Sequence, residues 1–162
     1  SVTLSPYLGF ESLRPALDAA AANQRGTFVL ALTSNPEGKS VQHVGKTEDT
    51  GAVAKQIIAA ATAENTAQTW ERMGSCGLVV GATVGDALHD LAIDLSAFNG
   101  PILSPGYGVQ GASAKDLYRV FAGVESQVLV NSSRGVLSAG PQVADLAQAA
   151  QMARADLVAA RG

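Results

Sequence analysis

The stretch Pro101–Phe121 reads PILSPGYGVQGASAKDLYRVF and contains one strand–loop–helix unit. Its apolar start, residues 101–103, predicts a short strand. Ser113 is placed to cap the following helix, with Asp116 three residues later as its partner in a partial capping box. Between them, residues 106–111 fit G-x-G-x-x-G, a pattern that holds phosphate groups through backbone N–H groups when it joins a strand to a helix. The unit therefore combines a β-α signal with a candidate phosphate loop.

The same alternation of a short apolar run and a longer helical pattern continues on both sides of this unit. Strands are predicted at Val2–Leu4, at Thr27–Leu32, around a centre at Leu78–Val80, at Pro101–Leu103 and at Gln127–Val130. Helices are predicted at Phe10–Ala22, from Thr50 to about Glu64, near Asp86–Leu91, after Ser113, and at Gln142–Arg161. An extension of the second of these helices through Trp70 towards Met73 is left open. A polar loop of about 16 residues ends near Asp49, and loops of that length are typical of lids or binding loops.

Repeated β-α units predict parallel strands covered by helices. Two α/β architectures remain open: a doubly wound sheet and a part of a (β/α)8 barrel. The pattern alone favours the doubly wound sheet, because five units complete a small domain of that kind whereas a barrel needs about 250 residues. In both, ligands bind at the carboxyl ends of the strands.

The composition indicates one globular α/β domain and excludes several classes of function. The 162 residues are 47% hydrophobic and 15% charged, with a net charge of −3 and no basic cluster, so no nucleic-acid partner is expected. Cys76 is the single cysteine, which favours a reducing cytoplasm. No apolar run reaches the ~20 residues of a membrane helix, so no membrane partner is expected. His43 and His89 lack the spacing of a metal site, and no metal is predicted.

Every predicted strand is followed by a polar or glycine-rich segment. These segments are residues 5–9, 33–38, 81–83, 104–111 and 131–135. Two that follow neighbouring strands suit a phosphate, because one is the glycine loop and the other places Arg134 after two serines. The G-x-G-x-x-G pattern is also found in dinucleotide-binding proteins, where an acidic residue ends the next strand. Here the acidic residue at about that distance, Glu125, comes before the next predicted strand. A dinucleotide site is therefore the weaker interpretation. Glu37 lies in Pro36-Glu37-Gly38, which we interpret as a plain turn.

Read in order, the strand ends resemble a known family. SPYLG (5–9), FVLALTSNPEG (28–38) followed by VQ, GLVVGAT (77–83), PGYGVQGA (105–112) and NSSRGVL (131–137) resemble the later part of orotidine 5'-phosphate decarboxylase, in its longer actinobacterial subfamily. The resemblance implies a (β/α)8 TIM barrel that converts orotidine 5'-monophosphate (OMP) to UMP in pyrimidine biosynthesis. It also implies a homodimer with active sites at the subunit interface, and no metal or organic cofactor.

The same resemblance assigns roles to residues of the strand ends. Ser34 matches the serine that recognises the pyrimidine edge, Gln110 matches the glutamine of the phosphate loop, and Arg134 matches the arginine that pairs with the phosphate. Their neighbours Thr33, Pro105, Gly106 and Ser133 complete the expected substrate-binding set. Tyr107 occupies a position where the family leads us to expect a smaller apolar residue.

The catalytic signature of that family, which resembles D-A-K-R-G-D, is not found in this sequence. Lys46-Thr47-Glu48-Asp49 has K-x-x-D spacing but lies in the polar loop, where we expect solvated charges. We therefore expect no catalytic residue in this chain. The chain also lacks an initiating Met and begins inside a predicted strand, so residues 1–162 are expected to be a fragment that supplies barrel strands four to eight.

Such a fragment would need the N-terminal half of the barrel as a partner and would be inactive alone. An alternative from a different class is a self-contained α/β module that binds a phosphorylated ligand without catalysis. A third possibility is a dinucleotide-dependent oxidoreductase, which is supported only by the glycine loop.

Overall fold

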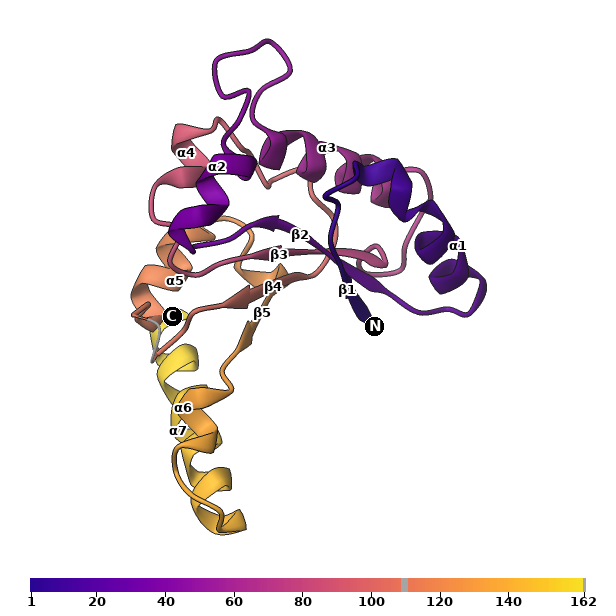
Figure 1. Cartoon of the computed structure of the whole chain (residues 1–162). Helices are drawn as coiled ribbons and strands as arrows, with labels where there is room; N and C mark the ends of the chain where they lie inside the picture. Colours follow the sequence, from indigo (N-terminus) through magenta and orange to yellow (C-terminus); the bar gives the residue numbers. More distant parts are fainter. Residues whose placement is uncertain (109–110, 162) are drawn as a thin grey trace.

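The computed structural model describes residues 1–108 and 111–161, which form one sheet of five parallel strands with helices between them (Figure 1). The strands are β1 (Val2–Leu4), β2 (Thr27–Leu32), β3 (Cys76–Val80), β4 (Ile102–Pro105) and β5 (Val128–Asn131). Their spatial order is β1-β2-β3-β4-β5. This uninterrupted order is the order of a barrel, whereas a doubly wound sheet reverses at a switch point. The doubly wound alternative is therefore wrong.

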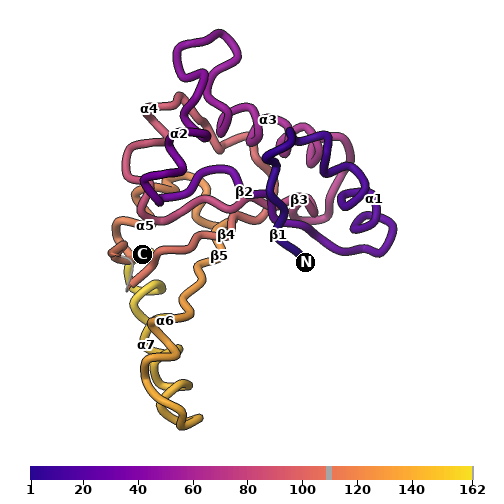
Figure 2. The backbone as a smooth tube through the Cα atoms, viewed as in Figure 1, coloured from indigo at the N-terminus to yellow at the C-terminus, as the bar shows by residue number. Residues whose placement is uncertain are grey.

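The helical segments join successive strands. They are η1 (Phe10–Leu13), α1 (Arg14–Ala22), η2 (Pro36–Gly38), α2 (Lys39–Gln42), α3 (Val53–Thr66), α4 (Ala87–Asp90), α5 (Ala114–Val120), η3 (Glu125–Gln127), α6 (Arg134–Leu137) and α7 (Val143–Arg161). The backbone trace in Figure 2 shows that α7 and α6 extend away from the end of β5, while α1 and α3 cover the β1–β3 side.

The two faces of the sheet differ in burial. Paired residues of parallel strands point to the same face, and Val29, Leu78 and Ile102 form one such row with no exposed surface. The next row, on the opposite face, is less buried: Val79 is 5% exposed, Leu30 and Leu103 are half-buried, and Leu129 on the edge strand β5 is 48% exposed. Within the described residues, the helices lie along the first face and leave the second one open (Figure 1). The sheet therefore has a packed outer layer and an apolar inner face that no helix of the described residues covers.

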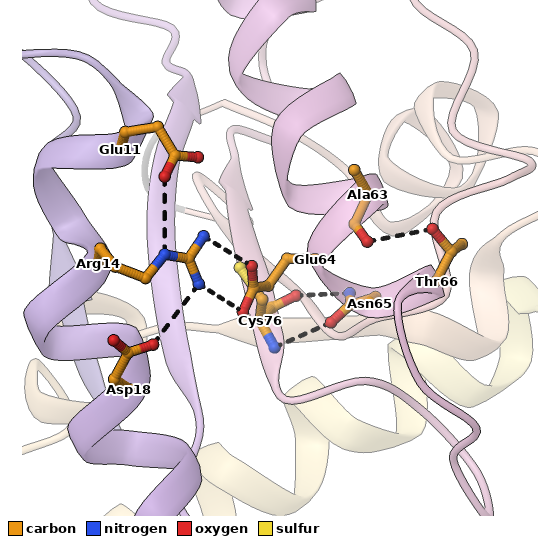
Figure 3. Close-up of polar contacts among 8 residues, drawn as sticks. All are labelled: Glu11, Arg14, Asp18, Ala63, Glu64, Asn65, Thr66 and Cys76. Atoms are coloured by element: carbon orange, nitrogen blue, oxygen red, sulfur yellow. Dashed lines mark hydrogen bonds and ion pairs between the residues drawn. The ribbon is translucent and has the colours of Figure 1, made fainter.

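Polar contacts at the ends of α1 and α3 fix these helices to each other and to β3 (Figure 3). Arg14 donates hydrogen bonds to the carboxylate of Glu64 at 3.0 and 2.9 Å. The buried Asn65 amide donates to the carbonyl of Cys76 at 2.8 Å and accepts from the N–H of Cys76 at 3.1 Å. The start of β3 is therefore held by the last turn of α3.

Several predicted boundaries are corrected by local hydrogen bonding. The helix predicted from Thr50 corresponds to α3, and its possible extension towards Met73 is wrong. α3 ends at Thr66, and the indole N–H of Trp70 donates to the backbone carbonyl of Asn65 at 2.7 Å. The predicted helix from Phe10 divides into η1 and α1, because Pro15 has no N–H to continue a single helix.

The carboxyl ends of β4 and β5 also extend one or two residues beyond the predicted strands. Pro105, predicted as part of a loop, is the last residue of β4 and pairs with Asn131 of β5. A proline can end a strand in this way because its carbonyl still accepts, here from the N–H of Ala82 at 2.7 Å. The two strand ends that carry the predicted phosphate residues are thus joined directly.

Candidate functional site

A small pocket lies between the carboxyl ends of β4 and β5. It is lined by Pro105, Gly106, Tyr107, Asn131, Ser132, Ser133, Arg134 and Gly135, and it has a volume of about 70 Å³. Such a volume suits one small polar group and is too small for a whole nucleoside. Four residues of the predicted substrate-binding set line this pocket together: Pro105, Gly106, Ser133 and Arg134.

Glycines shape the side of the pocket that follows β4. Gly106 and Gly108 have φ values of +111° and +77°, a region that residues with a side chain rarely adopt. The loop is closed by a hydrogen bond from the N–H of Gly108 to the carbonyl of Ala112 at 2.9 Å. Gln110, which was predicted to contact the phosphate from this loop, lies outside the described residues. Its role stays a prediction.

The side of the pocket that follows β5 supplies positive charge and N–H groups. Arg134 is exposed, and no carboxylate of the described residues lies within ion-pair distance of its guanidinium group. It begins the short helix α6, where the N–H groups of Arg134 and Gly135 have no partner inside the helix, whereas those of Val136 and Leu137 donate to the carbonyl of Ser133. A guanidinium group beside free backbone N–H groups is suited to bind an anion.

The other predicted site residues lie at the end of β2. The N–H of Thr33 donates to Oε1 of Gln42 at 2.9 Å, and Nε2 of Gln42 donates to Oγ1 of Thr33 at 2.7 Å. Ser34 is exposed beside Gly81, where a side-chain methyl group would lie 3.4 Å from the Ser34 backbone nitrogen and 3.5 Å from its Oγ. Ser34 therefore lies close to the residue that follows β3.

Sequence reasoning missed the part played by Gln42. The pair Val41-Gln42 belonged to the family resemblance, yet the residue carried no predicted role. Gln42 is the last residue of α2, and its side-chain amide forms hydrogen bonds with the backbone N–H and the hydroxyl of Thr33. These bonds fix the backbone directly before Ser34. A glutamine in a polar loop gives no local pattern that would reveal such a contact.

The structure does not bring all the predicted site residues into one pocket. Ser34 and Thr33 follow β2, whereas the pocket lies between β4 and β5, and β3 separates them. With strands about 4.8 Å apart, the two groups are separated by roughly 10 Å or more along the edge of the sheet. A ligand that contacts both must carry recognisable groups at its two ends, as a nucleoside monophosphate does.

The remaining candidate residues have structural surroundings. Burial raises the pKa of the Cys76 thiol to about 11, which fits a core residue and not a nucleophile. Glu37 lies in the turn η2, as predicted, and its hydrogen bonds with its own backbone N–H and with Asn35 lower the pKa of its carboxyl group. Residues 46–49 lie in exposed turns.

The described part of the chain also lacks two further features. It contains no cluster of three or more His, Cys, Asp or Glu side chains arranged to hold a metal ion. None of its helices combines the length and the apolar composition required to cross a membrane.

The fold and this edge of the sheet define an α/β protein of the (β/α)-barrel class, with polar groups gathered at the carboxyl ends of its strands. Residues 1–149 match the Orotidine 5'-phosphate decarboxylase / HUMPS family. The chain belongs to this family, and the family resemblance inferred from the five strand ends is confirmed.

Individual relatives support the same assignment. The chain is 51% identical over 160 residues to the orotidine 5'-phosphate decarboxylase of Salinispora arenicola, covering 99% of this chain and 55% of that protein. It is 50% identical over 151 residues to the enzyme of Streptomyces coelicolor, covering 93% of this chain and 51% of that protein. The chain therefore spans about half the length of the curated relatives that it matches.

Solved structures confirm the barrel-type fold. A crystal structure from Streptomyces avermitilis, provisionally named orotidine 5'-phosphate decarboxylase, has a TM-score of 0.86 and 49% identity, covering 98% of this chain and 53% of that one. The OMP decarboxylase of Leishmania donovani has a TM-score of 0.63 and 27% identity, covering 96% of this chain and 56% of that one. Five consecutive parallel strands are thus part of a (β/α)8 barrel architecture.

Proposed function

We propose that this chain forms the substrate-binding part of an orotidine 5'-phosphate decarboxylase, which converts OMP to UMP in pyrimidine biosynthesis. In this reaction the bond between the pyrimidine ring and its carboxylate breaks, carbon dioxide leaves, and the electron pair left on the ring carbon takes up a proton. The observation that carries the proposal is the pocket between β4 and β5, where Arg134 and a glycine loop meet in a member of this family.

The arrangement supports a division of roles along the sheet. Arg134 and the N–H groups beside it bind the phosphate, together with Gln110 of the glycine loop. Ser34, two strands away and held in place through Thr33 and Gln42, binds the edge of the pyrimidine. The substrate would then lie across the ends of β2 to β5, as ligands do in barrels of this class.

The proton donor and the charged groups around it would come from outside this chain. The 162 residues contain no D-x-K-x-x-D sequence, and the chain spans about half the length of its relatives. The inner face of the sheet is apolar and uncovered. These observations support an N-terminal set of βα units as the partner that completes the barrel. A cytoplasmic homodimer remains a part of the proposal that rests on the family resemblance alone.

The experiment compares this chain alone with a complemented chain. The complemented chain is this chain expressed together with, or fused behind, the part of the Salinispora arenicola relative that it does not match. Each preparation is incubated with OMP, and the loss of OMP and the formation of UMP are followed by absorbance and chromatography. We expect decarboxylation by the complemented chain and none by this chain alone.

A folded complemented chain that binds UMP without consuming OMP would contradict the proposed reaction. It would favour the alternative of a module that binds a phosphorylated ligand without catalysis. Decarboxylation by this chain alone would contradict the proposed division between the two parts of the barrel.

A further inference from the structure

The glycine loop beside the pocket is attached to the C-terminal helix α7 by one side chain. The phenol of Tyr107 donates a hydrogen bond to Oδ2 of Asp156 at 2.7 Å, and its oxygen lies 3.4 Å from the carbonyl oxygen of Ala153. The two partners are 49 positions apart in the sequence. Asp156 also lies beyond residues 1–149, which match the family.

Tyr107 lies between the hydrophobic core and two cavities. The ring forms part of the wall of the 70 Å³ pocket, and a separate cavity of about 440 Å³ also borders it. This second cavity is lined by Tyr107, Gly108, Gly111, Ala112, Ser113, Ser132, Gly135, Ala153 and Asp156. One side of Tyr107 packs against the hydrophobic core, and the hydrogen bond to Asp156 fixes the hydroxyl end of the ring.

The helix that holds Tyr107 contacts both sides of the pocket. α7 packs against α5, which follows the glycine loop, and against α6, which begins at Arg134. The link from Tyr107 to Asp156 therefore ties the glycine loop to the same helix that supports the arginine. Glycines lose more conformational freedom on ordering than other residues, so a loop with Gly106, Gly108 and Gly111 gains most from such a link.

We propose that Tyr107 and Asp156 are positioning residues that hold Gly106–Gly108, the part of the glycine loop beside the pocket, in a phosphate-binding arrangement. This inference rests on the proposed function, in which the pocket binds the phosphate of the substrate. The pair lies beside the phosphate pocket and not at the predicted pyrimidine contact, so we expect its loss to act mainly on substrate binding.

The hydrogen bond is available across the pH range of an assay. Burial and the nearby carboxylate of Asp156 raise the pKa of Tyr107 to about 12. The phenol therefore remains protonated, and a donor, at neutral and mildly basic pH.

The test uses the complemented chain with Tyr107→Phe, Asp156→Ala and Asp156→Asn, and with Gln151→Ala as a control at an exposed position of α7. Tyr107→Phe and Asp156→Ala should raise KM for OMP about fivefold to tenfold, the effect of losing one hydrogen bond that acts equally in the ground and transition states. kcat should change less than about twofold. Asp156→Asn keeps an acceptor and should restore most of the loss.

A second measurement does not depend on turnover. Titration of each variant with inorganic phosphate should show affinity weakened by a similar factor in Tyr107→Phe and Asp156→Ala, with the control unchanged. Thermal unfolding of each variant shows that it is folded. Tyr107→Phe removes only one oxygen and should melt close to the wild-type temperature.

The two measurements separate this proposal from the proposed function. A wild-type protein that binds phosphate without decarboxylating OMP, with weaker binding in both variants, would refute the decarboxylase and support the positioning pair. An active enzyme whose variants keep the wild-type KM and phosphate affinity would overturn the positioning pair alone. Absence of phosphate binding by the wild-type protein would overturn it as well.

Discussion

Among single residues, Asn65 carries an unusually large share of the local structure. It is a buried polar side chain whose amide satisfies both backbone groups of Cys76, the first residue of β3. Gly74 and Gly100 lie directly against this amide, and a side chain at either position would collide with it. The position thus requires both a hydrogen-bonding group and small neighbours.

Replacing Asn65 by Ala should lower the free energy of unfolding by about 2–4 kcal/mol, because two buried backbone groups lose their partner. Thr66→Ala is a matched control, since Thr66 is exposed and bonds only carbonyls of its own helix. The control should change stability by less than about 0.5 kcal/mol. Urea unfolding of both variants in the complemented chain measures the difference, and equal losses would show that the Asn65 contacts contribute little.

Arg134 is the residue on which phosphate binding should depend most strongly. Arg134→Ala should raise KM for OMP by about tenfold to a hundredfold, since a hydrogen bond to a charged group contributes about 1.5–3 kcal/mol. Arg134→Lys should recover part of this loss, because lysine keeps the charge and loses the paired donors.

Arg154→Ala, at an exposed arginine of α7, is the control for general loss of charge. Steady-state kinetics of the three variants provides the measurement. If Arg134→Ala left KM at the wild-type value, Arg134 would have no place in the site.

Among the helices, α5 shows most clearly how a short element is defined by its ends. Asp116 accepts hydrogen bonds from the hydroxyl of Ser113 at 2.6 Å and from its N–H at 3.2 Å, while the N–H of Asp116 donates to Ser113 Oγ at 3.1 Å. This is the capping box predicted from the sequence, now complete in both directions. The helix begins directly after the glycine loop, so its first turn also fixes the end of that loop.

The capping box gives α5 a pH-dependent stability. The hydrogen bonds from Ser113 lower the pKa of Asp116 below its ordinary value of 3.8. A lowered pKa in the folded state stabilises the protein above the ordinary pKa, and this contribution is lost as the pH falls through the folded-state value.

Asp116→Asn should therefore lower the melting temperature at pH 5 to 8, and the difference from wild type should shrink as the pH falls below 3.8. Asp49→Asn, in an exposed turn, controls for the removal of a charge. Melting curves from pH 7 to pH 3 provide the measurement. A difference that stays constant down to pH 3 would exclude the ionised carboxylate as its cause.

For the molecule as a whole, the uncovered face of the sheet is the dominant feature. β1 and β5 are edge strands, and Val2 and Leu129 on them are largely exposed. Unpaired edges beside an apolar face promote association with other chains.

This chain alone should therefore aggregate, associate through its edges, or melt without cooperativity, and the complemented chain should melt cooperatively. Size-exclusion chromatography with light scattering and calorimetry compares the two preparations. A stable monomer of this chain alone with a sharp melting transition would contradict the expectation.

The sequence was sufficient to locate all five strands, because buried parallel strands are short apolar runs with polar ends. It placed the last two strands too early, because Pro105 and Asn131 look like loop residues and pair only through their backbones. Periodicity favoured the wrong architecture, since both candidate folds repeat the same β-α unit. The barrel came from the resemblance of the strand ends to a family.

The candidate site was predictable only where its residues belong to motifs. Arg134 and Gly106 were found because they lie in recognisable strand ends. The contact between Tyr107 and Asp156 could not be found in this way, because it joins two segments far apart in the sequence. α6 was missed because a helix of four residues has no hydrophobic period.

The described lining of the pocket between β4 and β5 comes from two short stretches, residues 105–107 and 131–135. The predicted contact to the other end of the ligand comes from a separate segment around Ser34. The two ends of the site can therefore diverge independently in evolution. Descendants of this scaffold could replace the strand ends at β2 and β3, and so exchange one phosphorylated metabolite for another, while inheriting the same anchor for the phosphate.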